Sequence, residues 1–299
     1  MINRLDAQSI QFLANLQRIQ ERSQRAERQI ASGIRLEKAS DAPEQVIEIL
    51  QLRTRVELNV QTQTNLARVN AQVNAAESAV REAVSIVERV RVLGAQAATH
   101  DAASRLTMGQ QVKHLHDTLI SLTGTSAEGR FVFAGDGATA PPYQADPLAL
   151  NGVQRVSGAT TNTAQVVDER NIVIGVARTA SEVFDAPGTA NVFRAVEDVA
   201  RAMALDDQDA VKAALPNVVN ALDHLNAQLA FYGTAQNRVT SALHAAKKNA
   251  TNLHSSLSKL QDTDLPAAIL ELNAAKLHHE AALMAQSKVP RSTLFDFLG

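Results

Sequence analysis

The chain has 299 residues, a formal net charge of −2 at pH 7, 3% aromatic residues and neither Trp nor Cys. Positive and negative residues are interspersed, so no basic field is available for nucleic acid or an anionic membrane. The lack of Cys excludes disulfides and thiolate metal sites. A hydrophobic content of 45% allows a sizeable core, which must be built from aliphatic residues, and we expect narrow helical seams.

Residues 211–260 form the stretch around which the rest of the chain is organised. Its apolar residues alternate at spacings of four and three, which is typical of helices that pack along a partner. A helix of about 50 residues is about 75 Å long. We predict Asp206 as its N-cap, and Pro216 predicts a kink or a restart without a change of direction, because the seam keeps its phase.

The N-terminal part of the chain predicts three more helices. Residues 5–30 carry a weaker seam that ends at Gly33, a residue suited to the position beyond a helix C-cap. Asp41 and Pro43 predict the start of a second long helix, which runs without Gly or Pro to Gly94. A turn near residues 100–101 leads to a third helix, which ends near residue 124.

Residues 131–188 differ in character, because Gly and Pro separate short β-rich runs. Strands are predicted at 131–135, 153–156 and 165–167, the last forming a hairpin with 172–174. This segment is too short to be a large domain. Helix returns after Gly188, and residues 262–264 predict a stop and a new start before the last helix, which ends at Pro290.

Both terminal helices are weakly amphipathic, and a helix of this kind depends on packing against a partner. The apolar residues at the very C-terminus are unusual on a soluble monomer and suggest burial in an assembly. We therefore predict an assembly interface made by thirteen residues: Leu5, Phe12, Leu16, Ile19, Ile30, Leu265, Ile269, Leu272, Leu283, Leu294, Phe295, Phe297 and Leu298.

No pattern of residues predicts catalysis, cofactor binding or a metal site. His114 and His116 point to different sides of a helix, and His278 and His279 are adjacent, so we interpret these histidines as solvated surface residues. Gly135 and Gly137 lack the third glycine of a dinucleotide loop. No stretch approaches 18 apolar residues, and the N-terminus does not read as a cleavable signal peptide.

Several motifs resemble the flagellin superfamily. Residues 29–36 (QIASGIRL), followed by ASDAP at 39–43, are similar to its N-terminal signature, and YGTAQNR at 232–238 resembles a block of its C-terminal half. Asp262 and Asp264 resemble the acidic pair before its last helix. Pro43, the segment GRFVFAG at 129–135 with PPY at 141–143, and the ending LFDFL at 294–298 are similar to the hook-associated proteins of the hook–filament junction.

The resemblance implies a mainly α fold, an elongated bundle of long coiled-coil-like helices formed by the N- and C-terminal thirds, with a small inserted β-rich domain. Residues 1–40 and 262–299 would pair as an inner domain, 41–130 and 189–261 would form the long-helix bundle, and 131–188 the outer domain. The terminal helices would order on assembly.

The implied function is mechanical and not enzymatic: an adaptor that joins a hook-side junction protein to the flagellin filament. Its partners would be itself, flagellin, the junction protein and a flagellar export chaperone. The resemblance implies type III export and an extracellular location on the flagellum at the hook–filament junction. Two alternatives remain open: a short flagellin that forms the filament itself, and an intracellular helical scaffold or signalling coiled coil. An enzyme is a more distant alternative.

Overall fold

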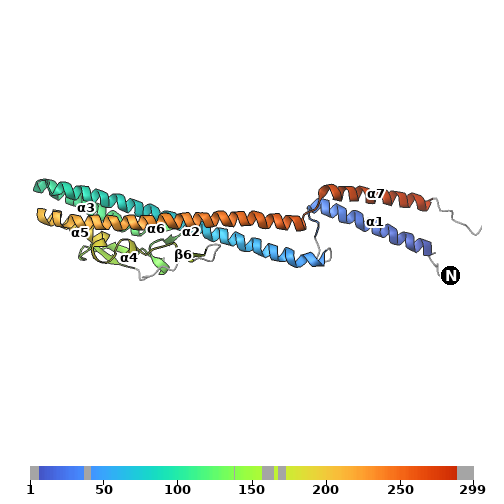
Figure 1. Ribbon diagram of the computed structural model, residues 1–299, viewed down its shortest axis with the longest axis horizontal. Coiled ribbons are helices and arrows are strands. Elements are labelled where there is room, and N and C mark those ends of the chain that lie inside the picture. Colours follow the sequence, from blue (N-terminus) through green and yellow to red (C-terminus); the bar gives the residue numbers. More distant parts are fainter. Residues whose placement is uncertain (1–6, 37–41, 138, 157–164, 168–172, 288–299) are drawn as a thin grey trace, which may run out of the picture. The chain divides into compact units, whose positions relative to one another are not determined.

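The computed structural model describes residues 7–36, 42–137, 139–156, 165–167 and 173–287 (Figure 1). The chain divides into two compact units, the first made of Met1–Leu58 and Ala250–Gly299 and the second of Asn59–Asn249. The boundaries fall inside the two longest helices, α2 (Pro43–Ala97) and α6 (Gln208–Gln261). The division into three domains that the sequence suggests stays a prediction.

The predicted helical seams form the core of the second unit, and the mainly α fold is confirmed. Val73, Val80 and Val87 of α2 recur every seven residues and are at most 2% exposed, as are Val211 and Val218 of α6. Two further helices, α3 (Ala102–Thr123) and α5 (Val192–Ala204), pack against each other (Figure 1). The seam of α2 is narrow and mainly aliphatic, whereas α5 buries most of its residues, among them Phe193.

The start of α6 differs from its prediction by one residue. Asp207, not Asp206, caps the helix, because its carboxylate Oδ1 accepts the backbone N–H of Ala210 at 2.9 Å. Asp206 instead turns the chain after α5 in a left-handed conformation, with φ of 56°. Pro216 lies inside the continuous helix, so the restart that this residue allowed does not occur.

The described strands between Ser126 and Gly175 form three separate antiparallel pairs. They pair β1 (Ser126–Ala127) with β2 (Arg130–Phe131), β3 (Tyr143–Ala145) with β4 (Val153–Arg155), and β5 (Gln165–Val167) with β6 (Val173–Gly175). The β5–β6 hairpin and the strand near residue 153 were predicted. The predicted strand at 131–135 is wrong beyond Phe131, because Val132, Phe133 and Ala134 turn inward and are buried instead of extending a ladder.

Several of the few aromatic residues gather where this inserted segment meets the helices. The Phe133 ring lies 5.4 Å from that of Phe184 and 6.3 Å from that of Tyr232, measured between centroids, with edge-to-face geometry. The Asp185 carboxylate accepts hydrogen bonds from the Tyr143 hydroxyl at 2.9 Å and from two Asn side chains, those of residues 151 and 191, at 3.2 and 2.7 Å. The β3–β4 hairpin is therefore fixed to the helical core.

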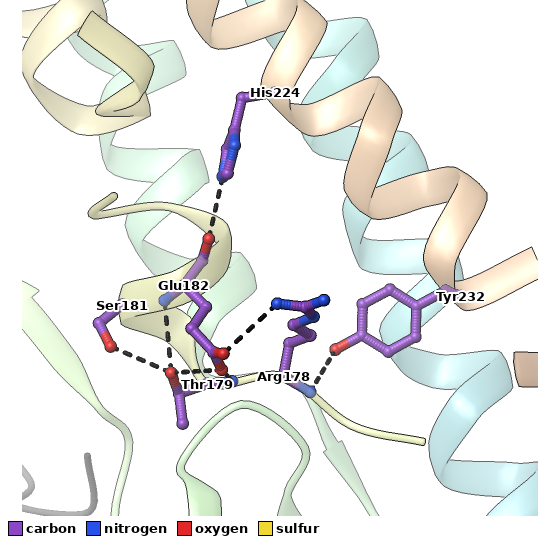
Figure 2. A network of polar contacts seen from close by, with 6 residues as sticks. All are labelled: Arg178, Thr179, Ser181, Glu182, His224 and Tyr232. Atoms are coloured by element: carbon purple, nitrogen blue, oxygen red, sulfur yellow. Dashed lines mark hydrogen bonds and ion pairs between the residues drawn. The ribbon is translucent and has the colours of Figure 1, made fainter. Parts of the chain in front are cut away.

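A second set of polar contacts fixes the short helix α4 (Ala180–Val183) to α6 (Figure 2). Thr179 and Glu182 form a capping box at its start. The Tyr232 hydroxyl accepts the backbone N–H of Arg178 at 3.1 Å, and His224 Nε2 lies 2.9 Å from the carbonyl oxygen of Glu182. Tyr232 thus joins the aromatic cluster to the polar network, and burial raises the pKa of its hydroxyl.

His116 of α3 is fully buried against α5 and the β3–β4 hairpin, so its interpretation as a solvated residue is wrong. Its Nε2 lies 3.1 Å from the carbonyl oxygen of Asn151, so Nε2 carries the donated proton, while the buried Nδ1 has no partner among the described residues. Gly152, at φ of 72°, packs so closely that a Cβ there would lie 2.7 Å from the imidazole Cε1. Desolvation lowers the pKa of His116, against the opposing charge of Glu197.

In the first unit, two stretches of backbone that are far apart in sequence meet. One follows the end of the terminal helix α1 (Ala7–Ser32), and the other precedes the start of the terminal helix α7 (Leu265–Ser287). Gly33 leaves α1 with φ of 71°, as predicted for a helix stop. Its carbonyl accepts the N–H of Thr263 at 2.9 Å, and the N–H of Arg35 donates to the carbonyl of Gln261 at 2.7 Å. The Arg35 guanidinium also donates to the carbonyl of Leu260 at 2.8 Å.

The loss of the Arg35 side chain should loosen this backbone junction. Arg35→Ala removes charge-assisted bonds to the Leu260 carbonyl and to Gln45 Oε1, so we expect a local destabilisation of about 1 kcal/mol, or roughly fivefold faster amide exchange at residues 33–35 and 261–263. Hydrogen exchange measured by mass spectrometry on the purified chain tests this. Arg53→Ala, also exposed, is the control, and equal exchange in the two variants would contradict the role of Arg35.

The buried imidazole predicts a pH dependence of the free energy of unfolding. Because the folded-state pKa of His116 is lowered, the unfolded chain takes up a proton near the ordinary pKa of about 6.5 while the folded chain does not. This contribution to stability is complete above that pH and is lost as the pH falls below it. Urea unfolding from pH 7.5 to 5.0 should show a steeper loss for the natural chain than for His116→Gln. If the free energies of unfolding of the two chains depended on pH in the same way, the protonation of His116 would not contribute to stability.

Candidate assembly surface

The terminal helices α1 and α7 lie side by side and bury a thin seam between them (Figure 1). Ala26 of α1 and Ala268 and Ala275 of α7 are buried at 1%, 6% and 5% exposure, and their small side chains allow the backbones to approach closely. Arg22 pairs with Glu271 at 2.9 Å, but both side chains are exposed, so the pair is worth at most about 1 kcal/mol. This interface alone is a weak one.

The α7 helix carries apolar side chains on nearly all sides and not only toward α1. Leu270, Leu277 and Met284 recur every seven residues and are 70%, 65% and 65% exposed. Leu265, Ile269 and Leu283 lie on another side and are 45%, 47% and 47% exposed. A helix with large apolar side chains on two sides needs an apolar contact on each of them to remove these side chains from water. The pairing with α1 therefore leaves α7 incompletely covered.

The predicted interface residues separate into three groups. Phe12, Leu16, Ile19, Ile30 and Leu272 are partly buried, whereas Leu265, Ile269 and Leu283 are exposed. The remaining five lie outside the described residues: Leu5, Leu294, Phe295, Phe297 and Leu298. Whether these thirteen residues form an interface between subunits stays a prediction.

Sequence analysis missed the stripe made by Leu270, Leu277 and Met284. The predicted seam of α7 runs through residues 265, 269, 272 and 283, which lie on another side of the helix. The signal was present, because the three residues follow one another at strict seven-residue spacing. Two exposed apolar residues of α1, Ile10 and Leu13, were missed because they lie off the seam that faces α7.

A groove of about 350 Å³ lies between α1 and α7, next to the buried seam. Polar and charged side chains dominate its lining: Ile19, Gln20, Ser23, Gln24, Glu27, Ala275, Lys276, His279 and Glu280. Such a lining suits charged side chains better than an apolar ligand. Within residues 7–36 and the other described ranges, no group of three or more His, Asp or Glu residues could hold a metal ion. No helix in those ranges is long and apolar enough to span a membrane.

Several solved structures share this fold. A candidate flagellar hook-associated protein from Vibrio parahaemolyticus has 17% identity and a TM-score of 0.64, covering 74% of this chain and 100% of its own. FlgL from Bacillus cereus has 17% identity and a TM-score of 0.56, with coverages of 71% and 100%. Flagellar hook-associated protein 3 from Legionella pneumophila has 13% identity and a TM-score of 0.60, with coverages of 71% and 98%.

Family models match both helical parts of the sequence, although no curated protein sequence matches the chain significantly. Residues 2–138 match the bacterial flagellin N-terminal helical region. Residues 215–298 match the bacterial flagellin C-terminal helical region. These matches include the backbone junction between residues 33–35 and 261–263, the helices α1 and α7, and the YGTAQNR block. On the strength of both matches, this chain belongs to the bacterial flagellin family.

Proposed function

We propose that this chain is a structural subunit of the bacterial flagellum that joins a hook-side junction protein to the flagellin filament. The observation that carries the proposal is the incomplete covering of α7, whose Leu270, Leu277 and Met284 need an apolar environment that α1 does not supply. Other copies of the chain and the neighbouring flagellar proteins would cover this face. The contact between copies would be heterologous and would extend around a ring or along a helix.

The location and the remaining partners are those that the likeness to the flagellin superfamily implies. The subunit would be exported through the flagellar type III channel, with a chaperone bound to its C-terminal region in the cytoplasm, and would assemble outside the cell at the hook–filament junction. The likeness to hook-associated proteins supports the junction position. In this role the chain needs no enzymatic activity, no cofactor, no nucleic acid and no membrane partner.

The alternatives are less favoured. An intracellular scaffold has no need of a half-covered terminal helix, and the flagellin family membership argues against it. A short flagellin differs from an adaptor in one property that can be measured, because it would extend indefinitely from a seed of its own kind. The adaptor instead needs flagellin for growth beyond the junction.

Charging the exposed stripe of α7 should abolish assembly without unfolding the chain. In flagellated cells that lack the natural gene, Leu277→Glu with Met284→Glu should be exported but fail to support filaments, because the carboxylates cannot be buried in an apolar contact. Asn273→Glu with Gln286→Glu, on the same helix, is the matched control and should build normal filaments. Electron microscopy and swimming assays give the readout, and circular dichroism checks the folding of each variant.

Normal filaments on cells with the Leu277→Glu and Met284→Glu variant would overturn the assembly role of this stripe. Long filaments grown from the purified natural chain alone would replace the adaptor by the short flagellin. Neither result is expected.

A further inference from the structure

The pair formed by α1 and α7 carries opposite charges on its two edges, within the first unit. The basic edge is defined by Arg18, Arg22 and Arg25, which follow at spacings of four and three and so share one side of α1. The acidic groove is defined by Glu27 and Glu280, which line the cavity on the other side of the α1–α7 seam. At about 100° per residue, Arg18 and Glu27 lie on opposite sides of α1.

The charges on both edges are poorly neutralised within the chain. Among the described residues, Glu280 and Arg25 make no ion pair, Glu27 accepts only the Ser23 hydroxyl at 3.4 Å, and Arg18 donates only to the Asn15 side chain at 3.5 Å. Arg22 alone is paired, with Glu271. Glu21 on the basic edge and Lys276 and His279 in the groove reduce the difference in charge, but among the described residues Arg18, Arg25, Glu27 and Glu280 make no ion pair.

We propose that the acidic groove between α1 and α7 receives the basic edge of α1 from a second copy of this chain. The groove, at about 350 Å³, offers two carboxylates to guanidinium groups, and these can bind a carboxylate through two parallel hydrogen bonds. Because the two surfaces lie on different sides of one helix pair, the contact is heterologous and repeats from copy to copy. The inference rests on the proposed function and names one contact within the assembly.

The charges select the neighbour and its position more than they hold it. Exposed ion pairs each contribute at most about 1 kcal/mol, and salt screens them. Complementary edges, however, disfavour wrong orientations, in which like charges meet. Burial of the apolar stripe of α7 provides most of the binding free energy, and the charged edges determine which copy binds and in which register.

Charge reversal and its compensation test the contact. Arg18→Glu with Arg25→Glu, and separately Glu27→Arg with Glu280→Arg, place like charges together and should each reduce the number of filaments per cell at least tenfold. The chain with all four substitutions restores opposite charges and should restore filaments. Arg91→Glu, exposed on α2 in the second unit, is the control and should leave assembly unchanged. Circular dichroism and export into the medium are measured for every variant.

Normal filaments from both reversed pairs, or no recovery in the fourfold variant when it is folded and exported, would overturn the proposed contact. The first result leaves the proposed function intact as long as Leu277→Glu with Met284→Glu still abolishes filaments. If that variant also assembles normally, the proposed function fails together with the contact. The two failures are therefore distinguishable.

A cysteine pair gives a direct readout of the same contact, because the natural chain contains no Cys. Arg25→Cys with Glu280→Cys should crosslink neighbouring copies on oxidised flagella into a ladder of multimers that collapses on reduction. Arg25→Cys alone should give no species beyond a dimer. A double variant that assembles but gives no ladder would contradict the contact.

Discussion

The backbone junction between residues 33–35 and 261–263 is the contact on which the terminal helices depend. Two hydrogen bonds between main chains and one from the Arg35 guanidinium tie the end of α1 to the start of α7, across more than two hundred residues of sequence. Neither helix has a seam strong enough to be stable alone in water. The junction places them together, so that a thin seam of alanines and a few larger residues is sufficient to pair them.

The same pairing leaves the exposed apolar surface on which the proposed function rests. The α7 helix buries one side against α1 and leaves apolar side chains exposed on its other sides. Ile10 and Leu13 of α1 are exposed in the same way. A monomer gains nothing from these side chains, whereas an assembly buries them. The second unit contrasts with this arrangement, because its aromatic cluster and the contacts of Asp185 and Tyr232 are satisfied within the chain. In the proposed function, neighbouring subunits cover the apolar side chains that the first unit leaves exposed.

Much of the fold could be predicted from the sequence, because long helices with regular seams and clear caps leave strong local signals. The extent of α6, the stop at Gly33 and the start of α2 at Pro43 were all predicted. The strand predicted at 131–135 is wrong beyond Phe131. A β-rich composition does not distinguish residues that form a β-ladder from residues such as Phe133 that pack into an aromatic cluster. Burial of His116 could not be predicted, since it depends on the β3–β4 hairpin that covers it. The second stripe of α7 was visible as a repeat, but it needed the structure to show which side α1 leaves open.

The most direct test of the account compares the amide hydrogen exchange of α7 in the purified monomer and in isolated flagella that contain the chain. The account predicts that amides of residues 265–287 exchange at least tenfold more slowly in the flagella, whereas amides in the core of α5 change little. Equal protection of α7 in the two states would mean that the monomer already satisfies this helix. It would contradict the claim that other copies complete it.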